Sequence, residues 1–154
     1  MNLLDQVLGR KKSFFSDEEE QRMVQAIRSA EKQTSGEIPI FIERHCRFID
    51  PVDRAKELFL ELNMQQTRER NGVLLYIACN DHQLAIWGDE GIHQKMGQAF
   101  WEKEIGIILS DFKQHHFIDG VCHIIHDVGQ ALKQHFPFED GDTNELDDSI
   151  VFGK

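Results

Sequence analysis

The chain has 154 residues, of which 40% are hydrophobic and 29% are charged, so it is long enough for one globular domain with a sizeable core. Its 27 acidic and 17 basic residues give a formal net charge of −10. This charge disfavours binding to nucleic acid or to an anionic membrane surface, and it favours a cation or a protein with a basic surface as the partner.

The cysteines and the apolar runs indicate a cytoplasmic protein. Three cysteines occur without a CxxC pair, which is typical of free thiols in a reducing compartment. The longest apolar run, GVLLYIAC, is far shorter than the roughly 20 residues that a membrane-spanning helix needs. We therefore expect neither a signal peptide nor an integral membrane segment.

The first two elements are a helix over residues 16–36 and a strand over residues 37–43. Ser16 with Glu19 three residues later predicts a capping box at the start of the helix. Isoleucine at every second position of EIPIFIE predicts the strand. Pro39 within it indicates an edge position or a bulge, because proline cannot donate a hydrogen bond to a neighbouring strand.

A second helix, over residues 50–70, leads to two consecutive strands. The run at residues 72–79 is almost entirely apolar, which is typical of a central strand covered on both faces. The strand QLAIWG at residues 83–88 follows after the short turn at residues 80–82. So short a connection predicts that these two strands pair antiparallel.

Two further helices are expected, over residues 93–114 and residues 117–136, with Pro137 ending the second. The element order predicts an α/β fold in which helices cover both faces of a small mixed sheet of three strands. Residues 1–15 are an N-terminal extension to the domain at residues 16–137. Residues 138–154 form an acidic tail, which we expect to be extended or disordered.

Acidic turns at the ends of the two central strands are the candidate binding residues. Asp81 and Asp89 lie at opposite ends of one short strand, roughly 20 Å apart at ~3.3 Å per residue, so they cannot share a metal ion. Asn71, Asp89 and Glu90 can instead converge at one sheet edge. Oxygen ligands on glycine-containing loops suit Ca²⁺ or Mg²⁺. The alternative is that all of them are ordinary turn residues.

Other chemistry has weaker support. The tail segment DGDTNELDD does not fit an EF-hand loop, because Glu145 and Val151 stand where the loop needs glycine and glutamate. His123 and His126 lie on one helix at a spacing that suits zinc, but no further ligands can be named, which favours surface histidines. No motif for a serine or cysteine nucleophile or for a nucleotide-binding loop occurs. A metal–carboxylate site would be able to support hydrolysis of a phosphate ester.

Four segments in order, SGEIPIFIE, AKELF, RNGVLLYIACNDHQLAIWGDEGIH and FIDGVCHIIHDVG, resemble the TPM domain family. That family is named after a plant thylakoid lumen protein, a photosystem II repair protein and a nematode membrane protein. The resemblance covers about residues 16–136 and is most specific at NGVLLYIA. Family members often carry a signal peptide and a membrane anchor, and because we expect neither here, the chain resembles the short soluble bacterial branch. The family resemblance implies a three-layer α/β/α sandwich.

The resemblance also implies functions. A plant member is associated with acid phosphatase activity and calcium binding, and other members look like accessory proteins of membrane complexes. The positions that match the family pattern are Glu37, Asn71, Gly72, Asp81, Gly88 and Gly91. The chain departs from the family pattern at His82, Asp89 and His93. These departures count against phosphatase activity, whereas Asp89 beside Glu90 still agrees with cation binding.

Three functional hypotheses follow. The first is a domain that binds a divalent cation, Ca²⁺ rather than Mg²⁺, through Asp89 and Glu90 with Asn71 or backbone carbonyls, while Glu37 and Asp81 are weaker candidates. The second is a metal-dependent phosphatase that uses the same site. The third is a metal-free protein-interaction module that meets a basic partner through its acidic surface.

Overall fold

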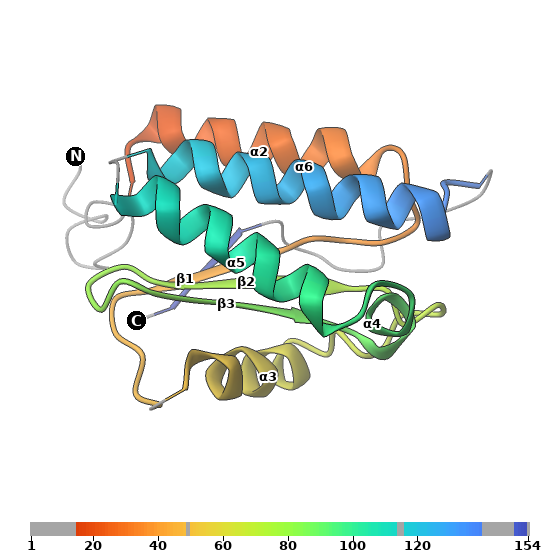
Figure 1. Ribbon diagram of the computed structural model, residues 1–154, viewed down its shortest axis with the longest axis horizontal. Helices are drawn as coiled ribbons and strands as arrows, with labels where there is room; N and C mark the ends of the chain where they lie inside the picture. Colours follow the sequence, from red (N-terminus) through yellow and green to blue (C-terminus); the bar gives the residue numbers. More distant parts are fainter. Residues whose placement is uncertain (1–14, 49, 114–115, 140–149, 154) are drawn as a thin grey trace, which may run out of the picture.

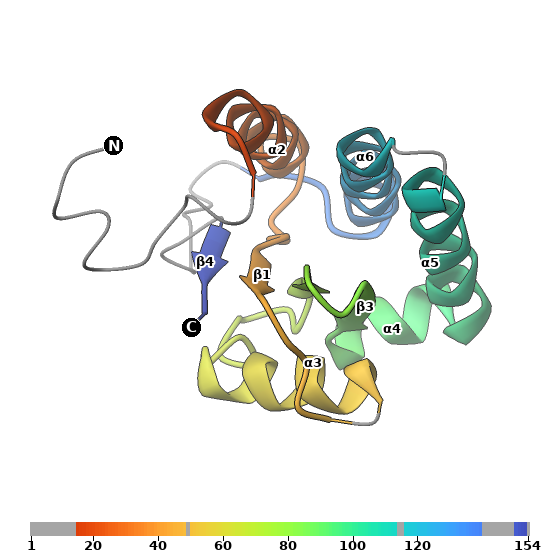
Figure 2. The ribbon, with the colours of Figure 1, turned by 90° about the vertical axis from the view of Figure 1, so that its left-hand side faces the viewer.

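A four-stranded mixed sheet separates two layers of helices (Figure 1). The computed structural model describes residues 15–48, 50–113, 116–139 and 150–153. Its elements in chain order are α2 (Asp17–Glu31), β1 (Ile40–Glu43), α3 (Pro51–Glu61), β2 (Val73–Ala78), β3 (Gln83–Gly88), α4 (Glu90–Met96), α5 (Gln98–Lys113), α6 (Phe117–His135) and β4 (Ile150–Phe152). Figure 2 shows α3 on one side of the sheet and α2, α5 and α6 on the other. This arrangement confirms the predicted α/β/α sandwich.

The strand order is β3-β2-β1-β4. β2 and β3 pair antiparallel, with Val73 opposite Gly88, so the predicted hairpin is confirmed. β1 pairs parallel with both β2 and β4. The sheet therefore has one strand more than predicted, because Ile150–Phe152, expected within an extended or disordered tail, is strand β4. The rest of that tail and the N-terminal extension, except Phe15, Phe138, Glu139 and Gly153, lie outside the described residues.

The position of Pro39 differs from the prediction. β1 is flanked by strands on both sides, and it begins one residue after Pro39 rather than including it. Pro39 still contributes its carbonyl oxygen, which accepts a hydrogen bond of 3.1 Å from the Leu75 backbone N–H. A proline at this place costs no strand hydrogen bond, because only its acceptor is used.

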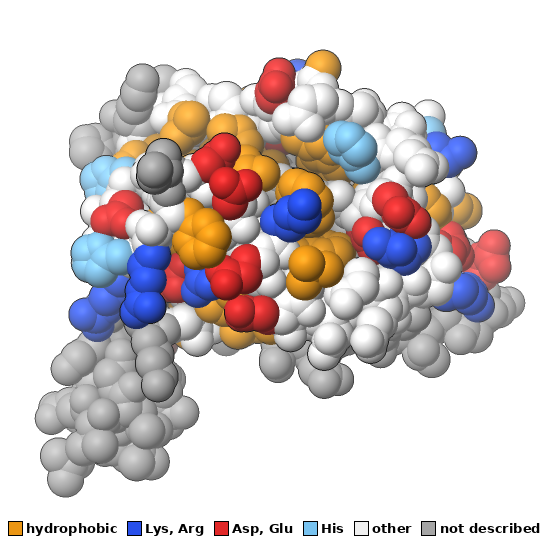
Figure 3. Space-filling model, turned by 90° about the horizontal axis from the view of Figure 1, so that it is seen from below, with side chains coloured by type: hydrophobic (Ala, Val, Ile, Leu, Met, Phe, Trp, Pro, Cys, Tyr) orange, Lys and Arg blue, Asp and Glu red, His pale blue; other side chains and the backbone are white. Residues whose placement is uncertain are grey.

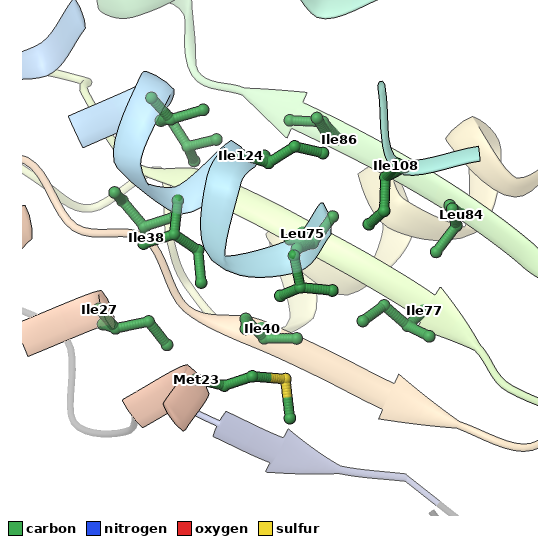
Figure 4. Close-up of a cluster of buried hydrophobic side chains, with 14 of the residues drawn as sticks. Met23, Ile27, Ile38, Ile40, Leu75, Ile77, Leu84, Ile86, Ile108 and Ile124 are labelled. Carbon is green, nitrogen blue, oxygen red and sulfur yellow. The ribbon is translucent and has the colours of Figure 1, made fainter. Parts of the chain in front are cut away.

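Alternating side chains build one core on each face of the sheet. Ile40, Ile42 and the odd-numbered residues of β2 belong to the core on the side of α2, α5 and α6. Figure 4 shows Ile40, Leu75 and Ile77 in this core with Met23 and Ile27 of α2. Phe41 and the even-numbered residues of β2 face α3. All six residues of β2 are buried, which confirms the predicted central strand.

Several helix limits differ from the prediction: α2 ends at Glu31 rather than at residue 36, and α4 begins at Glu90 rather than at residue 93. The Ser16 capping box is present at the start of α2. α3 ends at Glu61, so an irregular loop, residues 62–72, replaces the predicted last turns of that helix. The helix predicted over residues 93–114 is two helices, because Gly97 has a φ of 78° and breaks the run between α4 and α5. Within the described part of the chain, no helix has the length and apolar character needed to cross a membrane.

Candidate ligand-binding site

A pocket of about 400 Å³ lies where the last residues of β3 meet α3, α4 and α5. The apolar part of its wall is made by Val52, Phe59, Leu60, Ile86, Trp87 and Trp101. Figure 3 shows the face of the molecule that carries α3. Hydrophobic side chains are exposed there, with acidic, basic and histidine side chains between them. The pocket holds both tryptophans of the chain, so intrinsic fluorescence reports on it directly.

The pocket crosses the free edge of the sheet. Among the strands that the structure describes, β3 is the last on its side of the sheet. Ile86 belongs to the core under α5 and α6, whereas Trp87 packs with the core under α3. Since both residues line the pocket, the pocket reaches around the edge of β3 from one face of the sheet to the other.

The backbone of β3 presents hydrogen-bonding groups at this edge. The Asp89 N–H donates to the Gly72 carbonyl at 2.9 Å, which makes these residues a hydrogen-bonded pair of the antiparallel ladder. Because bonding alternates along such a ladder, the N–H and C=O groups of Ile86 and Gly88 are directed outward. Among the described residues, no group is hydrogen-bonded to these outward-directed positions.

An ion pair forms part of the pocket wall. Arg70 donates through Nε and Nη2 to the two carboxylate oxygens of Asp89, both at 2.7 Å, and through Nη1 to Glu90 at 3.2 Å. The hydrogen bond with Asp89 is the main cause that raises the pKa of Arg70. Asp89 also caps α4, because Oδ1 accepts from the Glu90 N–H at 2.8 Å.

Gly91 fits against the loop that carries Arg70. Its N–H donates to the Arg70 carbonyl at 2.8 Å. A Cβ at this position would lie 2.3 Å from the Glu69 carbonyl oxygen and 2.6 Å from that of Arg70. Such distances are far below van der Waals contact, so only glycine allows α4 to approach this closely.

Aromatic side chains form the two walls on either side of the strand edge. The Trp101 indole N–H donates to His93 Nδ1 at 2.9 Å, which assigns the ring proton of neutral His93 to Nε2. The Trp101 ring also lies on Gly88, where a Cβ would be only 2.5 Å from it. On the other wall, the Lys56 ammonium lies 5.6 Å from the centre of the Trp87 ring, within range of a cation–π interaction.

The candidate cation ligands do not converge. Asp89 and Glu90 are neighbours at the pocket rim, but the Asn71 amide donates to Ser35 Oγ at 3.1 Å instead. Glu37 is buried ahead of β1. At the other end of β3, Asp81 accepts one hydrogen bond from the backbone N–H of Cys46 and contacts Nδ1 of the His45 ring at 2.9 Å.

The fit to a divalent cation is poor in this arrangement. Both oxygens of Asp89 are engaged by Arg70, which already supplies the positive charge that a cation would bring. No group of three or more histidine, cysteine, aspartate or glutamate side chains among the described residues is placed to hold a metal ion. The Ca²⁺ site and the phosphatase activity therefore stay predictions.

The most important pocket residues were not singled out from the sequence. Arg70 lies in a loop of alternating charges, and nothing in TRERNG distinguishes its role from that of Arg68. The sequence does contain one indication of the pocket. Trp87, a large aromatic residue at the end of a predicted strand, is followed by Gly88, whose missing side chain leaves space beside the ring.

Comparison with known proteins places the chain among TPM domains. A profile of the TPM domain matches residues 10–131. The BA42 protein of the psychrophilic bacterium Bizionia argentinensis is 39% identical, with 94% of this chain and 99% of that chain covered and a TM-score of 0.83. No curated protein matches the chain.

Two more distant solved structures share the fold. The N-terminal domain of the cg2496 protein of Corynebacterium glutamicum is 11% identical with a TM-score of 0.61, and 91% of this chain and 82% of that chain are covered. The N-terminal domain of a protein from P. gingivalis is 15% identical with a TM-score of 0.65, and the coverage is 82% and 83%. At these identities the likeness concerns the fold alone.

Proposed function

The chain belongs to the TPM domain family, and from that premise we propose that it is a peptide-binding module. An extended segment of a partner protein adds to β3 as a further strand and places apolar side chains in the pocket. The observation that carries the proposal is the pocket's course around the free edge of β3, where the backbone groups of Ile86 and Gly88 point outward. Strand addition to an exposed edge is a recurrent mode of peptide recognition.

The two walls suit an added strand. Successive side chains of a strand point to opposite faces of the sheet. One side chain of the partner would thus meet Trp87 and Phe59 on the α3 side, and the next would meet Trp101 on the α5 side. The backbone hydrogen bonds give affinity, and the two apolar walls select side chains.

The charges around the pocket favour a basic partner. Lys56 and Arg70 are balanced in the pocket wall by Asp89 and Glu90, so the wall itself is neutral. The chain as a whole carries a net charge of −10. Basic residues on either side of an apolar segment would therefore be attracted over long range, which raises the rate of association.

A divalent cation at Asp89 and Glu90 is the second candidate, Ca²⁺ more than Mg²⁺. Its support is that these two adjacent carboxylates lie on the rim of the same pocket. Binding would require Arg70 to release Asp89, so the cation would compete with Arg70 for the Asp89 carboxylate. A metal-dependent phosphatase activity would depend on that exchange.

Short synthetic peptides test the first candidate. The probe is a tryptophan-free peptide of about six residues in which two adjacent valines are flanked on each side by two lysines. Its control has the same side chains but N-methylated amides at every residue, so that neither of its edges can donate hydrogen bonds to β3. We expect saturable changes in tryptophan emission and in the amide signals of Ile86 and Gly88 with the first peptide and much weaker changes with the control.

Equal binding of the two peptides, or no saturable change below about 1 mM, would overturn strand addition. A Ca²⁺ titration of the ¹⁵N-labelled protein separates the second candidate. Saturable shifts confined to residues 70–72 and 88–91, and lost in Asp89→Asn, would support the cation site. If no such shifts occur on addition of Ca²⁺, the cation site is rejected, independently of the result of the peptide titrations.

A further inference from the structure

A pair of acidic side chains faces each other between α5 and α6. Glu104 of α5 is only 1% exposed, and it shares a hydrogen bond with Asp127 of α6. Its other carboxylate oxygen, Oε2, has no hydrogen-bond partner among the described residues. Two carboxyl groups can form such a hydrogen bond only if one of them holds a proton.

The surroundings hold that proton on the pair up to near-neutral pH. Burial, the negative charge of Asp127 and the hydrogen bond with it raise the pKa of Glu104 to about 7, against the opposing effect of Lys103. His123 of α6 contacts Asp127 at 3.1 Å. Lys133, also on α6, lines the hollow of about 570 Å³ beside the pair, and the residue that α4 contributes to it, Met96, is uncharged.

The pair is connected to the peptide pocket through α5. Glu104 lies one turn after Trp101, which forms the α5 wall of that pocket. Phe100 packs edge-on against Trp101 with 5.0 Å between the ring centres, and it lines the hollow next to Glu104. A shift of this turn of α5 would therefore move the Trp101 ring on Gly88.

We propose that the Glu104–Asp127 pair is a proton-operated switch that sets the position of α5 and with it the shape of the peptide pocket. With the proton in place, the two side chains hold α5 against α6 and Trp101 stays on Gly88. When the proton leaves, two buried negative charges face each other and push α5 away from α6. The effect on peptide binding rests on the proposed function; the movement of Trp101 does not.

The switch predicts tighter peptide binding below neutral pH than above it. Loss of the proton deforms the wall that receives one side chain of the peptide, so affinity falls several-fold across the titration. Below neutral pH, the Glu104→Gln variant should bind as the wild type does at the same pH, because glutamine preserves the hydrogen bond to Asp127 without a charge.

Nuclear magnetic resonance follows the switch directly, without a ligand. The carboxyl carbon of Glu104 and the indole N–H of Trp101 are recorded from about pH 5 to about pH 9. Both signals should titrate together with a midpoint near 7. In Glu104→Gln that transition of Trp101 should disappear, although His93, its hydrogen-bond partner, is unchanged.

Two further variants control the experiment. Glu102→Gln removes an exposed carboxylate from the same helix and should leave the transition in place. Asp127→Asn removes the facing charge and should move the Glu104 midpoint to lower pH. This variant keeps the test decisive if Glu104→Gln does not fold.

The outcomes distinguish the two proposals. A Glu104 carboxyl whose pKa lies near the ordinary value of about 4.5, or a Trp101 signal that does not change across the Glu104 transition, would overturn the switch. If the Trp101 indole signal changes with the protonation of Glu104 but the lysine–valine peptide binds at no pH, the switch is supported and strand addition is rejected. If the peptide binds with the same affinity on both sides of the transition, the link between proton and pocket is wrong.

Discussion

The Arg70 guanidinium and the Asp89 carboxylate meet in a two-point ion pair, with both nitrogen–oxygen distances at 2.7 Å. The pair joins the loop before β2 to the residue between β3 and α4. The Asp89 side chain is only 4% exposed, whereas that of Arg70 is 39% exposed. The carboxylate is thus the buried partner, and its replacement should have the larger structural effect.

Asp89 has two roles that substitutions can separate. Asparagine can still cap α4 but loses the negative charge, whereas alanine loses both. We expect Asp89→Ala to be less stable than Asp89→Asn by about 1 kcal/mol, the usual worth of a helix N-cap. Urea unfolding measures the difference. Glu90→Gln, at an exposed neighbour, is the control and should stay within about 0.5 kcal/mol of the wild type. Equal stability of the two Asp89 variants would show that the cap contributes nothing.

Gly91 tests the close approach of α4 to the Arg70 loop. Gly91→Ala places a methyl group 2.3 Å from the Glu69 carbonyl oxygen, and backbone must move to accommodate it. We expect a loss of about 1–3 kcal/mol in the free energy of unfolding, as for other overpacked sites.

The matched control for Gly91 is Gly106→Ala. Gly106 is exposed within α5, and a Cβ there meets no atom within 4 Å. Alanine at an open helical position should increase stability by up to about 1 kcal/mol. Chemical denaturation of both variants should give changes of opposite sign. A Gly91→Ala protein as stable as the wild type would contradict the packing of α4 described above.

Gly88 places Trp101 in the pocket wall. A Cβ at Gly88 would lie 2.5 Å from the Trp101 ring, so Gly88→Ala should displace the indole and lengthen its hydrogen bond with His93. In a Trp87→Phe background only Trp101 emits, and we expect its emission maximum to move to longer wavelength as water reaches the ring. An unchanged emission spectrum would show that Trp101 does not depend on this glycine.

The layers of the fold were predictable because their signals are local. β2 is apolar at every position, and a short turn connects it to β3, so the central strand and the hairpin follow from residues 72–88 alone. β4 was not predictable in this way. It contributes only Ile150–Phe152, and it becomes a strand by pairing with β1, more than a hundred residues earlier in the chain.

The site was less predictable than the fold. The separation of Asp81 from Asp89 followed from strand geometry, and the structure places them at opposite ends of β3. The partner of Asp89 did not follow, because several charged side chains in the preceding loop were equally close in sequence. Arg70 is the partner of Asp89 because of its backbone conformation. Its φ of 53° and the hydrogen bond that its carbonyl accepts from the Gly91 N–H hold the residue beside α4. Such a left-handed arginine leaves no mark in the composition or periodicity of the sequence.

The pKa of a second buried carboxyl group, that of Glu43, is lowered, whereas that of Glu104 is raised. Glu43 at the end of β1 is 6% exposed and accepts hydrogen bonds from Arg54 at 2.9 and 3.0 Å and from the Tyr76 hydroxyl at 2.5 Å. Burial alone would raise the pKa of Glu43, but the hydrogen bonds from Arg54 and Tyr76 outweigh it and lower the pKa. The folded state therefore binds its proton more weakly than the unfolded state does.

This shift makes stability depend on pH in the acid range. The contribution of Glu43 is fully present above its ordinary pKa of about 4.5 and is lost as the pH falls toward the lower value of the folded state. Tyr76→Phe removes one of the donors that lower the pKa, so it should cost about 1–2 kcal/mol near neutral pH. It should also shrink the loss on acidification, because the two states of the protein then differ less in proton affinity. Urea unfolding at a series of pH values between about 3 and about 6 measures both effects. A Tyr76→Phe protein whose stability falls with acid as steeply as that of the wild type would show that the hydroxyl does not hold the charge on Glu43, and the arginines Arg54 and Arg47 would then account for the lowered pKa.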